Sequence, residues 1–68
     1  MMTLIINGDR VTVPGTVATV SELLKHFSME QKVVIVELNE RILEKLEHQE
    51  TRLSDGDKIE IVHFVGGG

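Results

Sequence analysis

Two adjacent residues near the N-terminus, Asn7 and Gly8, limit the possible folds more than any other feature. Asn-Gly between short β-branched segments is the strongest local signal for a tight β-hairpin, because both positions of such a turn need positive φ angles. The pair predicts an antiparallel hairpin with strands at residues 3–7 and 10–13. Side chains alternate between the two faces of a strand. The residues predicted to face the core are Leu4, Ile6, Val11 and Val13.

The rest of the core has to come from aliphatic side chains. The 68 residues include no cysteine, tryptophan or tyrosine and only two phenylalanines. Without cysteine, a disulfide framework, a thiolate metal site and an iron–sulfur centre are all excluded. A hydrophobic content of 41% is far above that of disordered chains. The sequence therefore predicts one small domain of modest stability.

A single helix is predicted after the hairpin. Thr19 and Glu22 have the spacing of a capping box, which marks the start of a helix. Residues 32–38 follow and contain four consecutive β-branched residues, which predicts a central strand buried on much of both faces. The apolar residues at helical spacing in the predicted helix are Val20, Leu23, Leu24 and Phe27.

The second half of the chain predicts short elements separated by turns. Asn39-Glu40 is a turn candidate, and residues 41–43 are predicted to form a short strand. Residues 44–50 fit either a strand running into a loop or a tight helical turn. A further turn is predicted at residues 54–57, where Gly56 can take a positive φ.

The last predicted strand extends from residue 58 to about 65. Ile59 and Ile61 alternate with charged residues, so one face of this strand should be buried, which requires a place in the middle of the sheet. The resulting order of elements is that of an α+β domain of the β-grasp, or ubiquitin-like, type. We expect a mixed sheet of four to five strands with one main helix packed across it. The domain should span residues 1–65, and residues 66–68 should form a flexible tail.

The three C-terminal residues, Gly66, Gly67 and Gly68, are the most informative feature for function. A frayed end is the alternative explanation, because chain termini are often rich in small residues. A terminal carboxyl group has a pKa of about 3.5, so at neutral pH it is ionised and needs activation, for example as an acyl-adenylate. Glycine lets the backbone enter a narrow active site without a Cβ in the way. The tail therefore predicts that the terminal carboxylate of Gly68 is the reactive group.

The whole chain resembles the sulfur carriers of thiamine biosynthesis, which are ubiquitin-fold proteins that end in Gly-Gly. Here that motif is Gly67-Gly68, with Gly66 as an additional glycine. The segments that carry the resemblance are Asn7-Gly8, residues 19–24, residues 34–37 with Asn39, residues 53–61 and residues 65–68.

The resemblance implies a protein cosubstrate without catalytic residues and without a bound cofactor. An adenylyltransferase of the ubiquitin-activating type would use ATP-Mg to adenylate Gly68, while recognising Gly66 and Gly67. Sulfur from cysteine, delivered by a cysteine desulfurase system, would then give a Gly68 thiocarboxylate. Thiazole synthase would take that sulfur into the thiazole ring of thiamine.

A second candidate site is a docking patch near the tail. Val62 and Phe64 share the face of the last strand that Lys58 and Glu60 mark as solvent-facing, and Ile5 is expected beside them. Exposed apolar clusters often mark interfaces, although burial under a loop is the alternative. His26, His48 and His63 have no metal-ligand spacing, so we expect no metal site and interpret these histidines as structural or solvated.

Charge and hydropathy limit the partners. Seven basic against eleven acidic residues give a net charge of −4, which argues against nucleic acid and favours partners with basic docking surfaces. No apolar stretch approaches the length of a membrane span, and no signal peptide is evident, so a cytoplasmic location is expected. A molybdopterin-synthase-type carrier, a ubiquitin-like protein modifier and an interaction module with an inert tail remain alternatives.

Overall fold

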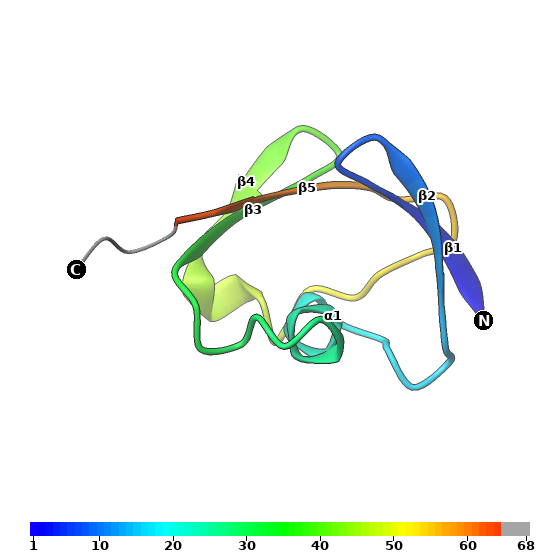
Figure 1. Cartoon of the computed structure of the whole chain (residues 1–68), viewed down its shortest axis with the longest axis horizontal. Helices are drawn as coiled ribbons and strands as arrows, with labels where there is room; N and C mark the ends of the chain where they lie inside the picture. Colours follow the sequence, from blue (N-terminus) through cyan, green and yellow to red (C-terminus); the bar gives the residue numbers. More distant parts are fainter. Residues whose placement is uncertain (65–68) are drawn as a thin grey trace.

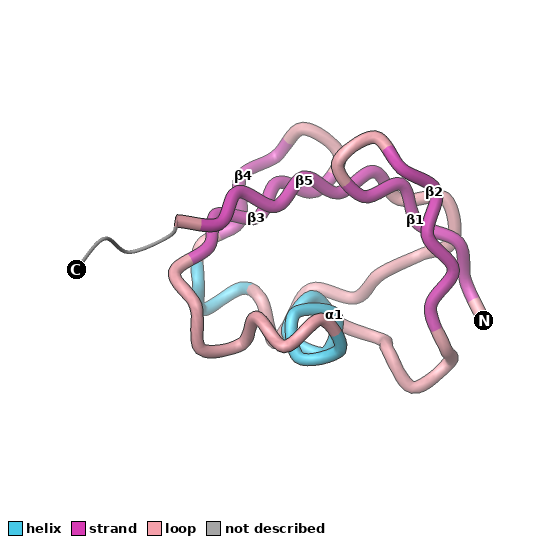
Figure 2. Tube along the Cα trace, in the orientation of Figure 1, coloured by secondary structure: helices cyan, strands magenta, loops and turns pink. Residues whose placement is uncertain are grey.

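The structure, a computed structural model, describes residues 1–64 and contains a five-stranded mixed sheet with one α-helix across one face (Figures 1 and 2). The order of strands in the sheet is β2-β1-β5-β3-β4. This arrangement confirms the predicted β-grasp class. The elements are β1 (Met2–Ile6), β2 (Asp9–Val13), α1 (Val20–His26), β3 (Val34–Leu38), β4 (Arg41–Leu43), the 3₁₀ helix η1 (Lys45–Glu47) and β5 (Lys58–His63).

Two tight hairpins supply four of the five strands. Asn7 and Gly8 connect β1 to β2 with φ angles of 50° and 86°. Asn39 and Glu40 connect β3 to β4 with φ angles of 48° and 71°. Positive φ at both central residues matches the right-handed twist of the flanking strands, which explains the choice of Asn-Gly in the first turn. Both turns were predicted from the sequence.

The last strand lies in the middle of the sheet, as predicted. β5 pairs in parallel with β1, with Ile59 level with Ile6, and antiparallel with β3, with Ile61 opposite Val36. Because both neighbours of β5 come from earlier in the chain, the two hairpins meet only through this strand (Figure 1).

The asparagines of the two turns extend the pairing to β5. The side-chain oxygen of Asn7 accepts from the backbone N–H of Ile61 at 2.8 Å, and its nitrogen donates to the Ile61 carbonyl at 3.2 Å. Asn39 Oδ1 accepts from the N–H of Lys58 at 3.0 Å. A side-chain amide carries the same donor and acceptor as a peptide group, so each asparagine continues a strand ladder beyond the point where the backbone turns away.

The hydrophobic core lies between the sheet and α1. A reciprocal capping box starts the helix, because Thr19 Oγ1 accepts from Glu22 N–H at 3.2 Å and Glu22 Oε1 accepts from Thr19 N–H at 3.1 Å. Such a cap stabilises a protein by about 1 kcal/mol. The buried apolar residues are Leu4, Val13, Val17, Val20, Leu23, Leu24, Val36, Leu43, Leu53, Ile59 and Ile61.

Two predictions about burial are wrong. Phe27 does not complete the buried stripe of the helix: it follows the last helical residue and is 37% exposed. The predicted strand at residues 32–38 is not buried on both faces, because Val33, just before β3, is 71% exposed and Ile35 is also exposed, whereas Val36 is fully buried. The physical reason is that α1 and η1 cover only one side of the sheet, and no element of residues 1–64 covers the other (Figure 2).

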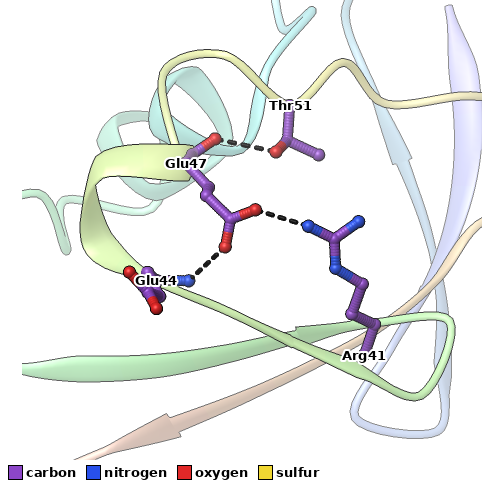
Figure 3. Close-up of polar contacts among 4 residues, drawn as sticks. All are labelled: Arg41, Glu44, Glu47 and Thr51. Atoms are coloured by element: carbon purple, nitrogen blue, oxygen red, sulfur yellow. Dashed lines mark hydrogen bonds and ion pairs between the residues drawn. The ribbon is translucent and has the colours of Figure 1, made fainter.

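The ambiguous stretch 44–50 contains a tight helical turn, the 3₁₀ helix η1. Figure 3 shows the polar contacts of Glu47, the last residue of η1. The Glu47 carboxylate forms an ion pair with Arg41 and accepts from the Glu44 N–H at 2.8 Å. The backbone carbonyl of Glu47 accepts from Thr51 Oγ1 at 2.7 Å. The Glu44 N–H and the Arg41 guanidinium lower the pKa of Glu47. Three groups, one on β4, one just before η1 and one after it, therefore converge on Glu47.

The turn around η1 also fixes the start of α1. The backbone N–H of Ser21 donates to the carbonyl of His48 at 2.9 Å, and that of Val20 donates to the carbonyl of Thr51 at 3.1 Å. The first N–H groups of a helix have no partner within the helix itself. The segment after η1 supplies those partners and thereby connects the helix layer to β4.

Candidate functional site

The predicted reactive tail lies outside the described residues. Nothing in the structure bears on Gly66, Gly67 and Gly68. The structure does describe the segment that leads to them, since β5 ends at His63 and the N–H of Phe64 still donates to the carbonyl of Val33 at 3.2 Å. The backbone is therefore paired with β3 up to the last described residue.

The sheet face opposite α1, here named the outer face, carries the predicted docking residues. Val62 is 52% and Phe64 is 50% exposed, so neither is buried under a loop. Val62 lies directly opposite Ile35 in the antiparallel register of β5 and β3. The backbone N–H of Phe64 donates a hydrogen bond to the Val33 carbonyl. We name these four side chains the apolar patch. It forms the part of the outer face that is nearest in sequence to the tail.

The third predicted docking residue, Ile5, does not join this patch. Ile5 lies on the outer face of β1, but the parallel register places it level with Lys58, four residues before Val62 on β5. At about 3.3 Å per residue this separates the two by roughly 13 Å along the strand. Ile35 takes the expected place beside Val62. Adjacent residues of a strand point to opposite faces, so Ile35 and Val36 had to lie on different faces. The sequence did not show which of them is exposed, because residues 33–36 are all apolar.

The side chain of His48 is buried, which the sequence did not predict. Only 6% of this residue is exposed, and its Nε2 atom has no hydrogen-bond partner among the described residues. Burial lowers the pKa of His48, although a hydrogen bond to the Leu43 carbonyl acts in the opposite direction. The imidazole is therefore held in its neutral form, with a structural role.

Two kinds of feature are absent from the part of the chain that the structure describes. Within residues 1–64 no three histidine, aspartate or glutamate side chains are grouped so that they could hold a metal. In the same part of the chain, no helix has the length and apolar character that crossing a bilayer requires.

Comparisons with known proteins place the chain in a family. The model of the ThiS family matches residues 4–68, which include the three glycines. The chain belongs to the ThiS family. It is 46% identical over 63 residues to the sulfur carrier protein ThiS of Bacillus subtilis, covering 93% of this chain and 96% of that protein.

Two other relatives add to this assignment. The crystal structure of the thiamine biosynthesis protein ThiS from Geobacter metallireducens superposes with a TM-score of 0.81 at 40% identity, covering 98% of this chain and all of that one. The chain is also 39% identical to part of a thiazole synthase of Paramagnetospirillum magneticum, covering 98% of this chain but 20% of that protein. A ThiS-like segment therefore accounts for a fifth of a protein that carries the name thiazole synthase.

Proposed function

We propose that the terminal carboxylate of Gly68 is the reagent of this ThiS-family sulfur carrier. As a member of the family, the chain is a protein cosubstrate in thiamine biosynthesis and not an enzyme. The observation that carries the proposal is the family match, which extends through the glycines to residue 68 of a chain with the β-grasp fold.

The proposed cycle has three steps. A ubiquitin-activating-type adenylyltransferase uses ATP-Mg to join AMP to the Gly68 carboxylate with release of pyrophosphate. A persulfide that a cysteine desulfurase system forms from cysteine attacks the acyl-adenylate and displaces AMP, and a thiol then reduces the resulting acyl disulfide to leave the Gly68 thiocarboxylate. Thiazole synthase then takes that sulfur. The carrier binds no cofactor in this cycle, and all partners are cytoplasmic proteins.

Glycine suits each position of the proposed tail. Gly66 and Gly67 allow the enzyme to enclose the backbone closely, and Gly68 leaves the carbonyl carbon free of a side chain. Three extended residues reach about 10 Å, enough to bring the carboxylate into a recessed site while the folded domain stays outside. The Val62 and Phe64 side chains, with Ile35 and Val33, are the proposed contact of the domain with the activating enzyme.

The test is pyrophosphate release by the cognate adenylyltransferase. Removing Gly68 shortens the reach of the carboxylate by one residue and should lower the rate at least about tenfold, because small displacements of a reacting group are costly. A matched chain of full length that ends in a carboxamide at Gly68 should release no pyrophosphate. Equal rates for the natural chain and either variant would refute the proposal.

A further inference from the structure

Two glutamates occupy directly opposite backbone positions on the outer face. The register of β3 and β5 pairs Glu37 with Glu60, next to the pair formed by Ile35 and Val62. Directly opposite side chains have Cβ atoms about 4.5–5.5 Å apart, and like charges in such a pair destabilise a sheet. The register therefore places two like charges on neighbouring strands of the uncovered face.

Within residues 1–64 neither Glu37 nor Glu60 forms an ion pair. The one ion pair within residues 1–64 joins Arg41 to Glu47, on a different part of the molecule. Lys58 shares the outer face with Glu60 but lies beside Ile5 and makes no ion pair with it. Both carboxylates are therefore available to a positive charge of a partner.

The side chains around the acidic pair are mostly apolar. Ile42 of β4 lies opposite Glu37 and is exposed, and the apolar patch begins with the next outward-facing residues, Ile35 and Val62. A partner that covers this apolar surface also removes water from both carboxylates. Burying two like charges without a counter-charge is strongly unfavourable. A partner must therefore present a cation here, and the planar guanidinium of arginine suits two adjacent carboxylates.

We propose that, after activation, the outer face docks on thiazole synthase, with an arginine of the synthase bound between Glu37 and Glu60. Apolar synthase side chains then cover the apolar patch, which contacts the activating enzyme earlier in the cycle. This inference rests on the proposed function. The choice of partner follows from the Paramagnetospirillum magneticum protein named thiazole synthase. A segment similar to this chain forms a fifth of that protein, so a carrier-like part and the rest of the synthase belong to one polypeptide. The net charge of −4 on the carrier agrees with a basic surface on the partner.

The order of groups along β5 also fixes the direction of docking. From the tail backwards, the outer face presents Phe64 and Val62, then Glu60, then Lys58. The apolar and acidic contacts are two residues, or about 7 Å, apart along the strand. A synthase surface with matching spacing accepts β5 in one direction only. That direction brings the segment leading to Gly68 to one fixed side of the contact.

The experiment compares three single variants by titration calorimetry against the cognate thiazole synthase, at low and at high salt. Glu37→Lys and Glu60→Lys each place a positive charge opposite the proposed arginine and should weaken binding at least about tenfold at low salt. Glu50→Lys makes the same change of charge on an exposed residue outside the outer face and should bind as the natural chain does. The two test variants should unfold at the same or a higher temperature, because an opposite-charge pair replaces a like-charge pair.

The combination of weaker binding with undiminished stability is the signature of the proposal, since a purely structural role predicts losses in both. Unchanged affinity of the two test variants overturns it, as does an equal loss for Glu50→Lys. A loss confined to pyrophosphate release would make the adenylyltransferase the occupant and overturn the choice of partner. The carboxamide test of Gly68 fails or succeeds separately, so a failure of the proposed function is recognised independently.

Discussion

The residue with the clearest link to pH is His48. Its side chain is buried, and burial lowers its pKa in the folded state, while the unfolded chain has the ordinary value of about 6.5. As the pH falls below that value, the unfolded state binds a proton before the folded state does. Stability is therefore complete above about pH 6.5 and decreases as the pH falls towards the folded pKa.

We predict that the urea midpoint of the natural chain falls between about pH 7.5 and pH 5 and that His48→Gln flattens this dependence. The carboxylate of Glu47 contributes at lower pH, since its pKa is lowered from 4.5. His26→Gln is the matched control, because His26 is exposed, and should retain the natural pH dependence. A slope of the same size in His48→Gln would show that His48 is not the titrating group.

The sequence around His48 pointed to a solvated position. Lys45, Glu47 and Glu50 surround it with charge, and the alternatives for this stretch were a loop or a tight helical turn. Burial arises because the segment after η1 caps the helix α1 through the His48 carbonyl, which lies 2.9 Å from the Ser21 nitrogen. Such a contact between elements far apart in sequence leaves no local pattern.

Among the elements, β5 separates stability from recognition most clearly. Its inner residues, Ile59 and Ile61, lie in the core between β1 and β3, while Val62 on its outer face is half exposed. Alternation along one strand thus gives the same six residues two roles.

Substitutions on the two faces of β5 should therefore have different effects. Ile59→Ala is expected to cost about 2–5 kcal/mol of unfolding free energy, because it leaves a cavity at a fully buried position. Val62→Lys should change stability by about 0.5 kcal/mol or less and raise the KM for the carrier in pyrophosphate release. Thermal unfolding and adenylation kinetics measure the two effects. Natural kinetics for Val62→Lys would remove Val62 from the docking surface.

Strands and turns were predictable because their signals are local. Asn7-Gly8, Asn39-Glu40 and the alternation of Ile59 with charged neighbours each identify an element within a few residues. The exposure of Ile35 was not predictable in the same way, because an unbroken apolar run fits a strand with one or two covered faces. Which faces are covered depends on the number of layers, and this molecule has two.

For the molecule as a whole, the order of elements predicted the fold class, and the resemblance of segments along the whole chain to the sulfur carriers of thiamine biosynthesis predicted the family. The placement of Ile5 was not, because it depends on the parallel register that sets Ile5 level with Lys58. Register between strands separated by most of the chain has no signal in one sequence.

The complete protein should be isolated from its native host partly with sulfur in place of one oxygen at its C-terminus. Intact-mass measurement detects this exchange, and treatment with an alkylating reagent that reacts with thiocarboxylates should shift only the sulfur-bearing form. Covalent attachment to lysines of other proteins, without the sulfur form, would instead indicate the ubiquitin-like modifier that the sequence left open.

Because β5 lies in the centre of the sheet, the proposed docking surface exists only when all five strands have paired. Glu37 belongs to the second hairpin and Glu60 to the closing strand, while β5 also pairs with β1 over a separation of 53 residues between Ile6 and Ile59. Closing so long a loop has a high entropic cost, which makes this pairing slow to form. A chain that ends before Lys58 lacks β5, the strand that joins the two hairpins in the sheet, and it also lacks Glu60. Such a chain therefore has no acidic pair. Enzymes that read this face would thus commit ATP and sulfur to carriers whose sheet has already closed.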